Sequence, residues 1–279
     1  MDINTYSETA FKGSKIITTA YSNSFSLAVK MLPPAISKGI YSIYGFVRLA
    51  DEIVDSFHNF DKTTLLDRFC EETEYAFKQG ISVNPVIHCF QITAAKYGIG
   101  ADLIDAFLSS MRKDLHTRNY DKEEYYDYIF GSADVVGLMC LKVFVEGDED
   151  AYNKLKTPAM RLGSAFQKVN FLRDIKNDYE KLNRKYFPGI DPDRFSQADK
   201  DAIIQEIKSD FKEAYSGILL LPRKVRLSVL TAYFYYSKLL RKLEKLPAAE
   251  LMQYRVSIPQ HKKLGILAFS YFRFKMRFI

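Results

Sequence analysis

The sequence predicts an all-α fold, and three observations support this prediction. Apolar residues recur at helical spacing from end to end. Signals for β-strands are scarce, because alternating runs are few and neither Asn-Gly nor Asp-Gly occurs. Proline and glycine divide the chain into stretches of helical length without a linker or repeat, so we expect one domain over residues 1–279. The expected breaks are Pro33-Pro34, Gly80 to Pro85, Gly98 to Gly100, Pro158, Pro188-Gly189, Pro192, Pro222, Pro247 and Pro259.

Composition narrows the class of protein. Hydrophobic residues make up 47% and charged residues 27% of the chain, as in ordinary soluble domains. The net charge of +6 includes no block of like charges, so we expect no nucleic-acid partner. A mildly basic surface would suit anionic lipid or a phosphorylated substrate. The widely spaced Cys70, Cys89 and Cys140 indicate neither a zinc site nor a disulfide framework.

The expected location follows from what the sequence lacks. The first residues do not have the pattern of a signal peptide, and no apolar run reaches the ~18 residues of a membrane span. We therefore expect a cytoplasmic protein. Peripheral attachment to the inner face of the membrane stays open, and the sequence does not indicate an oligomeric state.

The stretch from Gly163 to Tyr179 predicts a helix with an unusual polar stripe. Residues three and four positions apart share a helix face. The residues on this face are a glycine, two amides, two carboxylates and an ammonium group: Gly163, Gln167, Asn170, Asp174, Asp178 and Lys181. The rest of the circumference is mostly apolar, so we expect a buried helix whose polar stripe faces an internal site.

A second helix repeats this arrangement with Tyr44, Arg48, Asp51 and Asp55 on one face. Taken alone, this face is most simply a solvated stripe of ion pairs. Two such helices, however, place four carboxylates among apolar residues, where burial and mutual repulsion are costly unless cations neutralise them. Mg²⁺ binds one or two carboxylates together with substrate phosphates. The paired pattern therefore predicts a Mg²⁺–diphosphate site, with Mn²⁺ as an alternative ion.

Three other segments have more than one interpretation. Ser22 and Ser24 adjoin a helical run, where hydroxyls most often cap the helix but could also hold phosphate oxygens. Asp134 lies in a run of small residues and is either solvent-facing or a fifth carboxylate near the site. The tail after Phe269 alternates aromatics with cations, which suits docking on the domain more simply than a membrane interface.

These motifs together resemble the squalene and phytoene synthases, the head-to-head prenyl synthases. The matching stretches are Ser22-Asn-Ser24-Phe25, Tyr44-Gly-Phe-Val-Arg48-Leu-Ala-Asp51-Glu-Ile-Val-Asp55, Tyr128 to Ala133, Val136-Gly137-Leu-Met, Gln167-Lys-Val-Asn170-Phe-Leu-Arg173-Asp174 with Asp178, and Tyr186-Phe-Pro188. Glu52 and Asp134 depart from the family, which usually has Asp and Gly there. The resemblance is greatest to bacterial phytoene synthases of carotenoid pathways, and it covers roughly residues 20 to 255.

The resemblance implies an isoprenoid synthase fold with helices around a central cavity, and it implies roles for individual residues. The implied metal ligands are Asp51, Asp55, Asn170, Asp174 and Asp178. The implied substrate contacts are Ser22, Ser24, Phe25, Tyr44, Arg48, Gln167, Arg173 and Tyr236. The two aspartate pairs and Arg48 would be catalytic, and Tyr128 is a candidate proton acceptor beside the departing diphosphate.

The predicted function is the joining of two geranylgeranyl diphosphates into phytoene through a cyclopropyl diphosphate, without NADPH. Prenyl diphosphates are thus the expected small-molecule partners. One alternative is a dehydrosqualene or squalene synthase that acts on farnesyl diphosphate. Another is a non-catalytic all-α assembly or membrane-adaptor relative, which would have no need to retain all four aspartates.

Overall fold

The computed structural model describes residues 2–116, 119–259, 265–267, 269–270 and 274. The all-α prediction is confirmed, because these residues form helices and, apart from one isolated bridge between Asn119 and Lys185, no β-structure. The α-helices are α1 (Ile3–Tyr21), α2 (Asn23–Val29), α3 (Pro34–Asp55), α4 (Lys62–Gln79), α5 (Pro85–Tyr97), α6 (Ala101–His116), α7 (Lys122–Ile129), α8 (Val135–Phe144), α9 (Glu149–Leu182), α10 (Gln197–Ile218), α11 (Arg223–Lys245) and α12 (Ala248–Leu251). A π-helix, η1 (Phe130–Asp134), joins α7 to α8, and a 3₁₀ turn, η2 (Pro192–Arg194), precedes α10.

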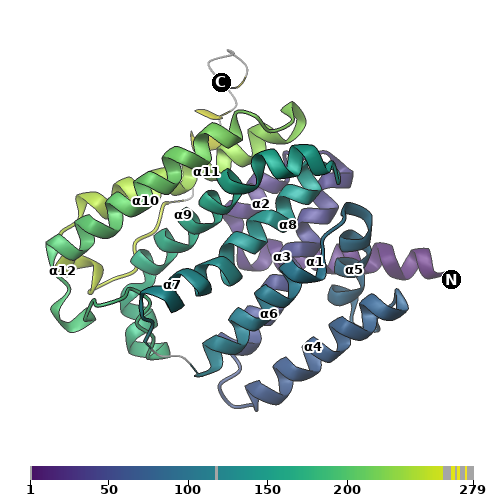
Figure 1. Ribbon diagram of the computed structural model, residues 1–279, viewed down its shortest axis with the longest axis horizontal. Coiled ribbons are helices and arrows are strands. Elements are labelled where there is room, and N and C mark those ends of the chain that lie inside the picture. Colours follow the sequence, from purple (N-terminus) through teal and green to yellow (C-terminus); the bar gives the residue numbers. More distant parts are fainter. Residues whose placement is uncertain (1, 117–118, 260–264, 268, 271–273, 275–279) are drawn as a thin grey trace.

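Helix α9 is the longest element and carries one of the two acidic motifs. Its 34 residues span about 51 Å. Figure 1 shows α9, α10 and α11 running alongside one another, and α9 also packs against η1 and α8. The predicted break at Pro158 is wrong, because α9 continues through it. Packing on both sides of α9 outweighs the one backbone hydrogen bond that a proline removes.

Side chains fix the ends of the helices that carry the site. Asp148 caps the start of α9 by accepting a hydrogen bond from the Ala151 amide. At the other end, Asn183 takes a left-handed conformation with φ of 52°, a common way to end a helix. Helix α3 begins with Pro34 in its first turn and ends at Asp55. Asp55 and Asp178 therefore both lie in the last turns of their helices.

The apolar core forms two clusters. The first surrounds α3, where Phe46 stacks on Phe90 with ring centroids 4.0 Å apart. The second surrounds the C-terminal half of α9, where Phe171 stacks on Tyr186, also at 4.0 Å. Leu162 of α9 packs against both clusters. Among the described helices, none combines the length and the apolar character needed to cross a lipid bilayer. Most of the tail after Phe269, with its alternating aromatics and cations, lies outside the described residues.

Candidate active site

A mostly apolar cavity of about 340 Å³ lies inside the helical bundle. Its wall is built by α2, α3, η1, α8, α9, α10 and α11. Along α9 the wall runs from Leu155 to Asn170, about 22 Å at 1.5 Å per residue. The polar lining gathers toward the acidic motifs, with Tyr44, Gln167 and Asn170 each within about two helical turns of an aspartate. The cavity thus suits a long hydrocarbon whose polar head lies beside the aspartates.

The polar stripe predicted on α9 is confirmed from Gly163 to Asp178, whereas Lys181, the last residue assigned to it, is exposed to solvent. Gly163, Gln167 and Asn170 line the cavity, and Asp174 and Asp178 follow on the same face one and two turns farther on. The Asn170 carboxamide oxygen is buried and has no hydrogen-bond partner among the described residues. An orphan acceptor next to two carboxylates fits a site that is completed by a cation.

On α3, Arg48 holds the first aspartate of its motif. Its guanidinium donates to Asp51 at 2.5 Å and also to Glu52. Burial, and then the negative charge of Asp55, raise the pKa of Asp51 to about 7 despite the nearby arginine. Arg48 therefore does form ion pairs on this face, as the simpler interpretation predicts. These ion pairs are only partly exposed to solvent, however, and the charge of Arg48 does not offset the burial of Asp51 and its repulsion by Asp55.

The aspartates of α9 lie in unequal surroundings. Arg173 and Arg255 both donate to Asp174, Arg255 at 2.6 Å, and they outweigh burial so that the pKa of Asp174 lies below its usual value. Asp178 makes no hydrogen bond to a cation within the described part of the chain. Burial, and then the charges of Asp174 and Asp55, raise its pKa to about 8.

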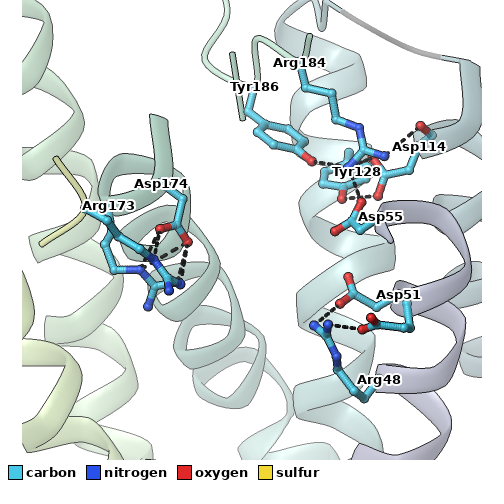
Figure 2. A network of polar contacts seen from close by, with 11 residues as sticks. Arg48, Asp51, Asp55, Asp114, Tyr128, Arg173, Asp174, Arg184 and Tyr186 are labelled. Carbon is cyan, nitrogen blue, oxygen red and sulfur yellow. Dashed lines mark hydrogen bonds and ion pairs between the residues drawn. The ribbon is translucent and has the colours of Figure 1, made fainter. Parts of the chain in front are cut away.

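The influence of Asp55 on Asp178 means that the two motifs share one electrostatic site. Figure 2 shows Arg48, Asp51 and Asp55 on α3, with Arg173 and Asp174 on the separate helix α9. Within the described residues, no three His, Cys, Asp or Glu side chains lie close enough to hold an ion by themselves. A site that supplies only one or two carboxylates to each ion suits Mg²⁺ that arrives with a diphosphate. The raised pKa values and the orphan Asn170 oxygen fit such an ion.

The aromatic side chains predicted to contact substrate, Phe25, Tyr44 and Tyr236, line the cavity, whereas Ser22 and Ser24 are not among its lining residues. Phe25 stacks on Tyr44 at 4.9 Å, and Tyr236 stacks on Phe166 at 4.0 Å, with all four lining the wall. The capping interpretation of Ser22 is confirmed, because its hydroxyl accepts from the Phe25 amide. Ser24 is a partly buried residue in the first turn of α2.

Tyr128 lies away from the cavity wall, in a buried polar cluster. Its hydroxyl donates to Asp114 at 2.7 Å, and burial followed by the charge of Asp114 raises the pKa of Tyr128 far above its usual value. Tyr120 donates to the same carboxylate at 3.2 Å. Tyr128 therefore stays a neutral phenol at any physiological pH.

The same cluster contains residues that sequence reasoning missed. Arg184 donates to Asp55 at 2.7 Å, to the Tyr186 hydroxyl at 3.1 Å and to the Asp114 carbonyl at 3.0 Å. Figure 2 shows this arginine between Asp55 and Asp114. Its position directly before the Lys185-Tyr186-Phe187-Pro188 motif was the only available signal.

Both interpretations of Asp134 are wrong. The residue is buried on η1, and its carboxylate accepts from the Ser164 hydroxyl at 2.6 Å. Burial raises its pKa to about 6, and its charged neighbours are Lys168, Asp210 and Arg161 rather than the motif aspartates. Ser132 and Ala133 of the π-helix line the cavity, whereas Asp134 does not and instead bonds to Ser164 of α9.

Two facing acidic helices above a deep apolar cavity define a prenyl-diphosphate type of site, and comparison with known proteins agrees. The squalene/phytoene synthase family model matches residues 18–262, so the chain belongs to the squalene/phytoene synthase family. It is therefore a prenyltransferase of the head-to-head kind, and its family implies prenyl diphosphate substrates.

Individual relatives and structures agree with this family. A phytoene synthase of Arthrospira platensis is 28% identical over 92% of this chain and 91% of its own length. A 4,4'-diapophytoene synthase of Staphylococcus haemolyticus is 26% identical over 68% of this chain and 66% of its own. The crystal structure of a dehydrosqualene synthase superposes with a TM-score of 0.82 at 21% identity, covering 99% of this chain and 100% of the other. The isoprenoid synthase fold predicted from the sequence is thereby confirmed.

Proposed function

We propose that this enzyme condenses two geranylgeranyl diphosphates into phytoene, with Mg²⁺ as its metal and without NADPH. The observation that carries the proposal is the long apolar cavity whose polar lining, Tyr44, Gln167 and Asn170, lies one to two helical turns from the motif aspartates. The similarity to proteins named phytoene synthase supports phytoene as the product.

In this proposal the acidic helices and their arginines hold the diphosphates. Arg48 and Arg173 are placed to meet phosphate oxygens, since each already lies beside a motif aspartate. Mg²⁺ held by Asp51, Asp55, Asn170, Asp174 and Asp178 would withdraw electrons from the leaving diphosphate and so ease cleavage of the allylic C–O bond. Gln167 supplies an amide where the polar wall meets the apolar one.

The cavity wall would govern what happens to the allylic cation. The double bond of the second substrate attacks it, and loss of a proton closes a cyclopropyl diphosphate. Cleavage of the second C–O bond, rearrangement and loss of a second proton then form phytoene. The apolar lining keeps water from the cations. The stacked faces of Phe25 and Tyr44 can each contribute about 0.5–2 kcal/mol of stabilisation.

The departing diphosphate is the better candidate for the proton acceptor. The hydroxyl of Tyr128 is already committed as a donor to Asp114, and the raised pKa keeps it protonated. A role for this tyrosine would therefore be that of a neutral dipole near the reaction, rather than of a base.

A second candidate substrate is farnesyl diphosphate, which would yield dehydrosqualene or squalene. The match to a 4,4'-diapophytoene synthase favours it, because that relative is as similar over its aligned part as several phytoene synthases are. Purified enzyme incubated with each prenyl diphosphate and Mg²⁺, with and without NADPH, separates the candidates by product length and saturation. A C40 triene formed without NADPH is the expected product, whereas a C30 product alone would refute the proposal.

The metal role is tested with Asp51→Ala and Asp174→Ala. Each should abolish Mg²⁺-dependent turnover while the helical circular dichroism stays unchanged, because both side chains lie on the surface of the site rather than in the apolar core. Full activity in both variants would refute the assignment. No turnover by the wild type with any prenyl diphosphate would instead favour a non-catalytic relative.

A further inference from the structure

We propose that Arg184 is a positioning residue that orients Asp55 for metal binding and ties the ends of the two acidic helices together, with Asp114 as its fixed counter-ion. This inference rests on the proposed metal role of Asp55. Arg184 belongs to neither aspartate motif, and 129 positions separate it from Asp55.

The side chain of Arg184 determines which oxygen of Asp55 is available. Its guanidinium donates to Oδ1 of Asp55 at 2.7 Å. Among the described residues, no hydrogen bond reaches the other oxygen, Oδ2. A carboxylate that is held at one oxygen has a fixed plane, and its free oxygen points in a defined direction. Metal-binding carboxylates are typically oriented by an outer partner in this way.

The main chain of Arg184 contacts the other motif. Its amide donates to the carbonyl of Asp178 at 2.9 Å, just beyond the left-handed Asn183 that ends α9. One residue therefore touches the last turn of α9 through its backbone and the last residue of α3 through its side chain. This residue therefore connects the C-terminal ends of the two acidic helices.

Asp114 and three tyrosines hold the guanidinium in place. The Asp114 carboxylate lies 3.7 Å from it and accepts hydrogen bonds from Tyr120 and Tyr128. The Tyr186 hydroxyl accepts from the same guanidinium nitrogen that binds Asp55. The side chains of Arg184 and Asp114 are each only 3% exposed, so neither can turn toward solvent.

Packing alone does not account for this cluster. A buried ion pair adds little net stability, because removing both charges from water offsets their attraction. The guanidinium also has a buried Nε that finds no partner in the described part of the chain. An arrangement that is costly for folding and directed at a motif aspartate is better explained by its effect on that aspartate.

The test compares Arg184→Gln and Arg184→Lys with a matched control, Lys168→Gln. Lys168 forms an equally buried ion pair with Asp210 at 2.7 Å, on the side of α9 away from the aspartates. The main readout is the Kd of a premixed Mg²⁺–inorganic diphosphate complex, measured by isothermal titration calorimetry. Melting temperature and the Mg²⁺ dependence of turnover are measured in parallel.

We expect Arg184→Gln to bind the complex about 10- to 100-fold more weakly, in the range found for outer partners of metal ligands. Arg184→Lys keeps the charge without the planar fork and should restore part of the loss. Lys168→Gln should melt at a lower temperature yet bind as the wild type does. If Arg184→Gln does not fold, Arg184→Lys and Tyr186→Phe carry the test, the latter with a loss of a few-fold.

Two results would overturn this inference and leave the proposed metal site intact. In the first, the wild type binds the complex and the Arg184 variants bind it with a Kd within twofold of the wild-type value. In the second, Lys168→Gln loses as much binding as Arg184→Gln does. Wild-type protein that does not bind the complex would overturn the proposed metal site, and the role of Arg184 with it. The two failures are therefore distinguishable.

Discussion

Replacement of Gly163 by alanine should destabilise the enzyme at the contact on which the cavity wall depends. A Cβ atom at this position would lie 2.6 Å from the carbonyl oxygen of Ala133 and 3.2 Å from the Cα of Asp134. Both atoms belong to the backbone of η1, so no side-chain rotation can relieve the overlap. Helix α9 and η1 must move apart, and both contribute to the cavity.

The size of the effect follows from two opposing contributions. Overpacking against a backbone typically costs about 1–3 kcal/mol, and a contact this short belongs near the upper end. Alanine recovers about 1 kcal/mol because it is the better helix former. The net loss is about 2 kcal/mol, which lowers the melting temperature of a chain of this size by about 4–8 °C.

The matched control is Gly13→Ala in α1. A Cβ there meets no atom within 4 Å, so only the gain in helix propensity remains, about 0.5–1 kcal/mol. Thermal unfolding of the ligand-free proteins, followed by calorimetry or circular dichroism, should move in opposite directions for the two variants. If both variants melt above the wild type by similar amounts, the close contact between α9 and η1 does not limit packing, and the reasoning fails.

Two further predictions concern the site. The pKa of Asp51 is raised to about 7 and that of Asp178 to about 8, so the folded protein holds these protons more tightly than the unfolded chain does. The metal-free enzyme should therefore lose stability as pH rises from about 4 to about 8. Mg²⁺ binding at pH 7 should then release about one proton, and the number released should fall toward zero at pH 9. Calorimetry in buffers of different ionisation enthalpy measures this release, and no release at pH 7 would contradict the raised pKa values. Ala159→Phe narrows the end of the cavity that lies away from the aspartates and should lower kcat/KM for geranylgeranyl diphosphate more than for farnesyl diphosphate. An equal loss for both substrates would show that this part of the wall does not select chain length.

The parts of the site that were predictable are those determined within a single helix. The stripe from Gly163 to Asp178 depends only on the helical repeat, and the structure places it as expected. Pro158 was misjudged because a local rule ends helices at proline, whereas packing of α9 against its neighbours keeps the helix intact. Asp134 was misjudged for a related reason, since its partner Ser164 lies on another helix.

The contact between Arg184 and Asp55 could not be predicted, because it depends on how α3 and the end of α9 meet in space. No periodic pattern links residues 129 positions apart. A buried aspartate such as Asp114 is also invisible in the sequence, where it reads as an ordinary polar residue at the end of an apolar helix.

The arginines explain how four carboxylates can share a site before any metal arrives. Asp51 is held by Arg48, Asp55 by Arg184, and Asp174 by Arg173 together with Arg255. Each arginine offsets part of the repulsion between the buried carboxylates, and each also fixes the position of the carboxylate that it contacts.

Asp178 is the exception, and its environment indicates where positive charge is most needed. It alone of the four makes no ion pair among the described residues, and its pKa is raised the most, to about 8. A cation that binds beside Asp178 therefore displaces a proton from this carboxyl group but no arginine. The remaining aspartates would share their charge between metal and guanidinium, so removal of Asp178 should weaken Mg²⁺ binding more than removal of Asp174 does.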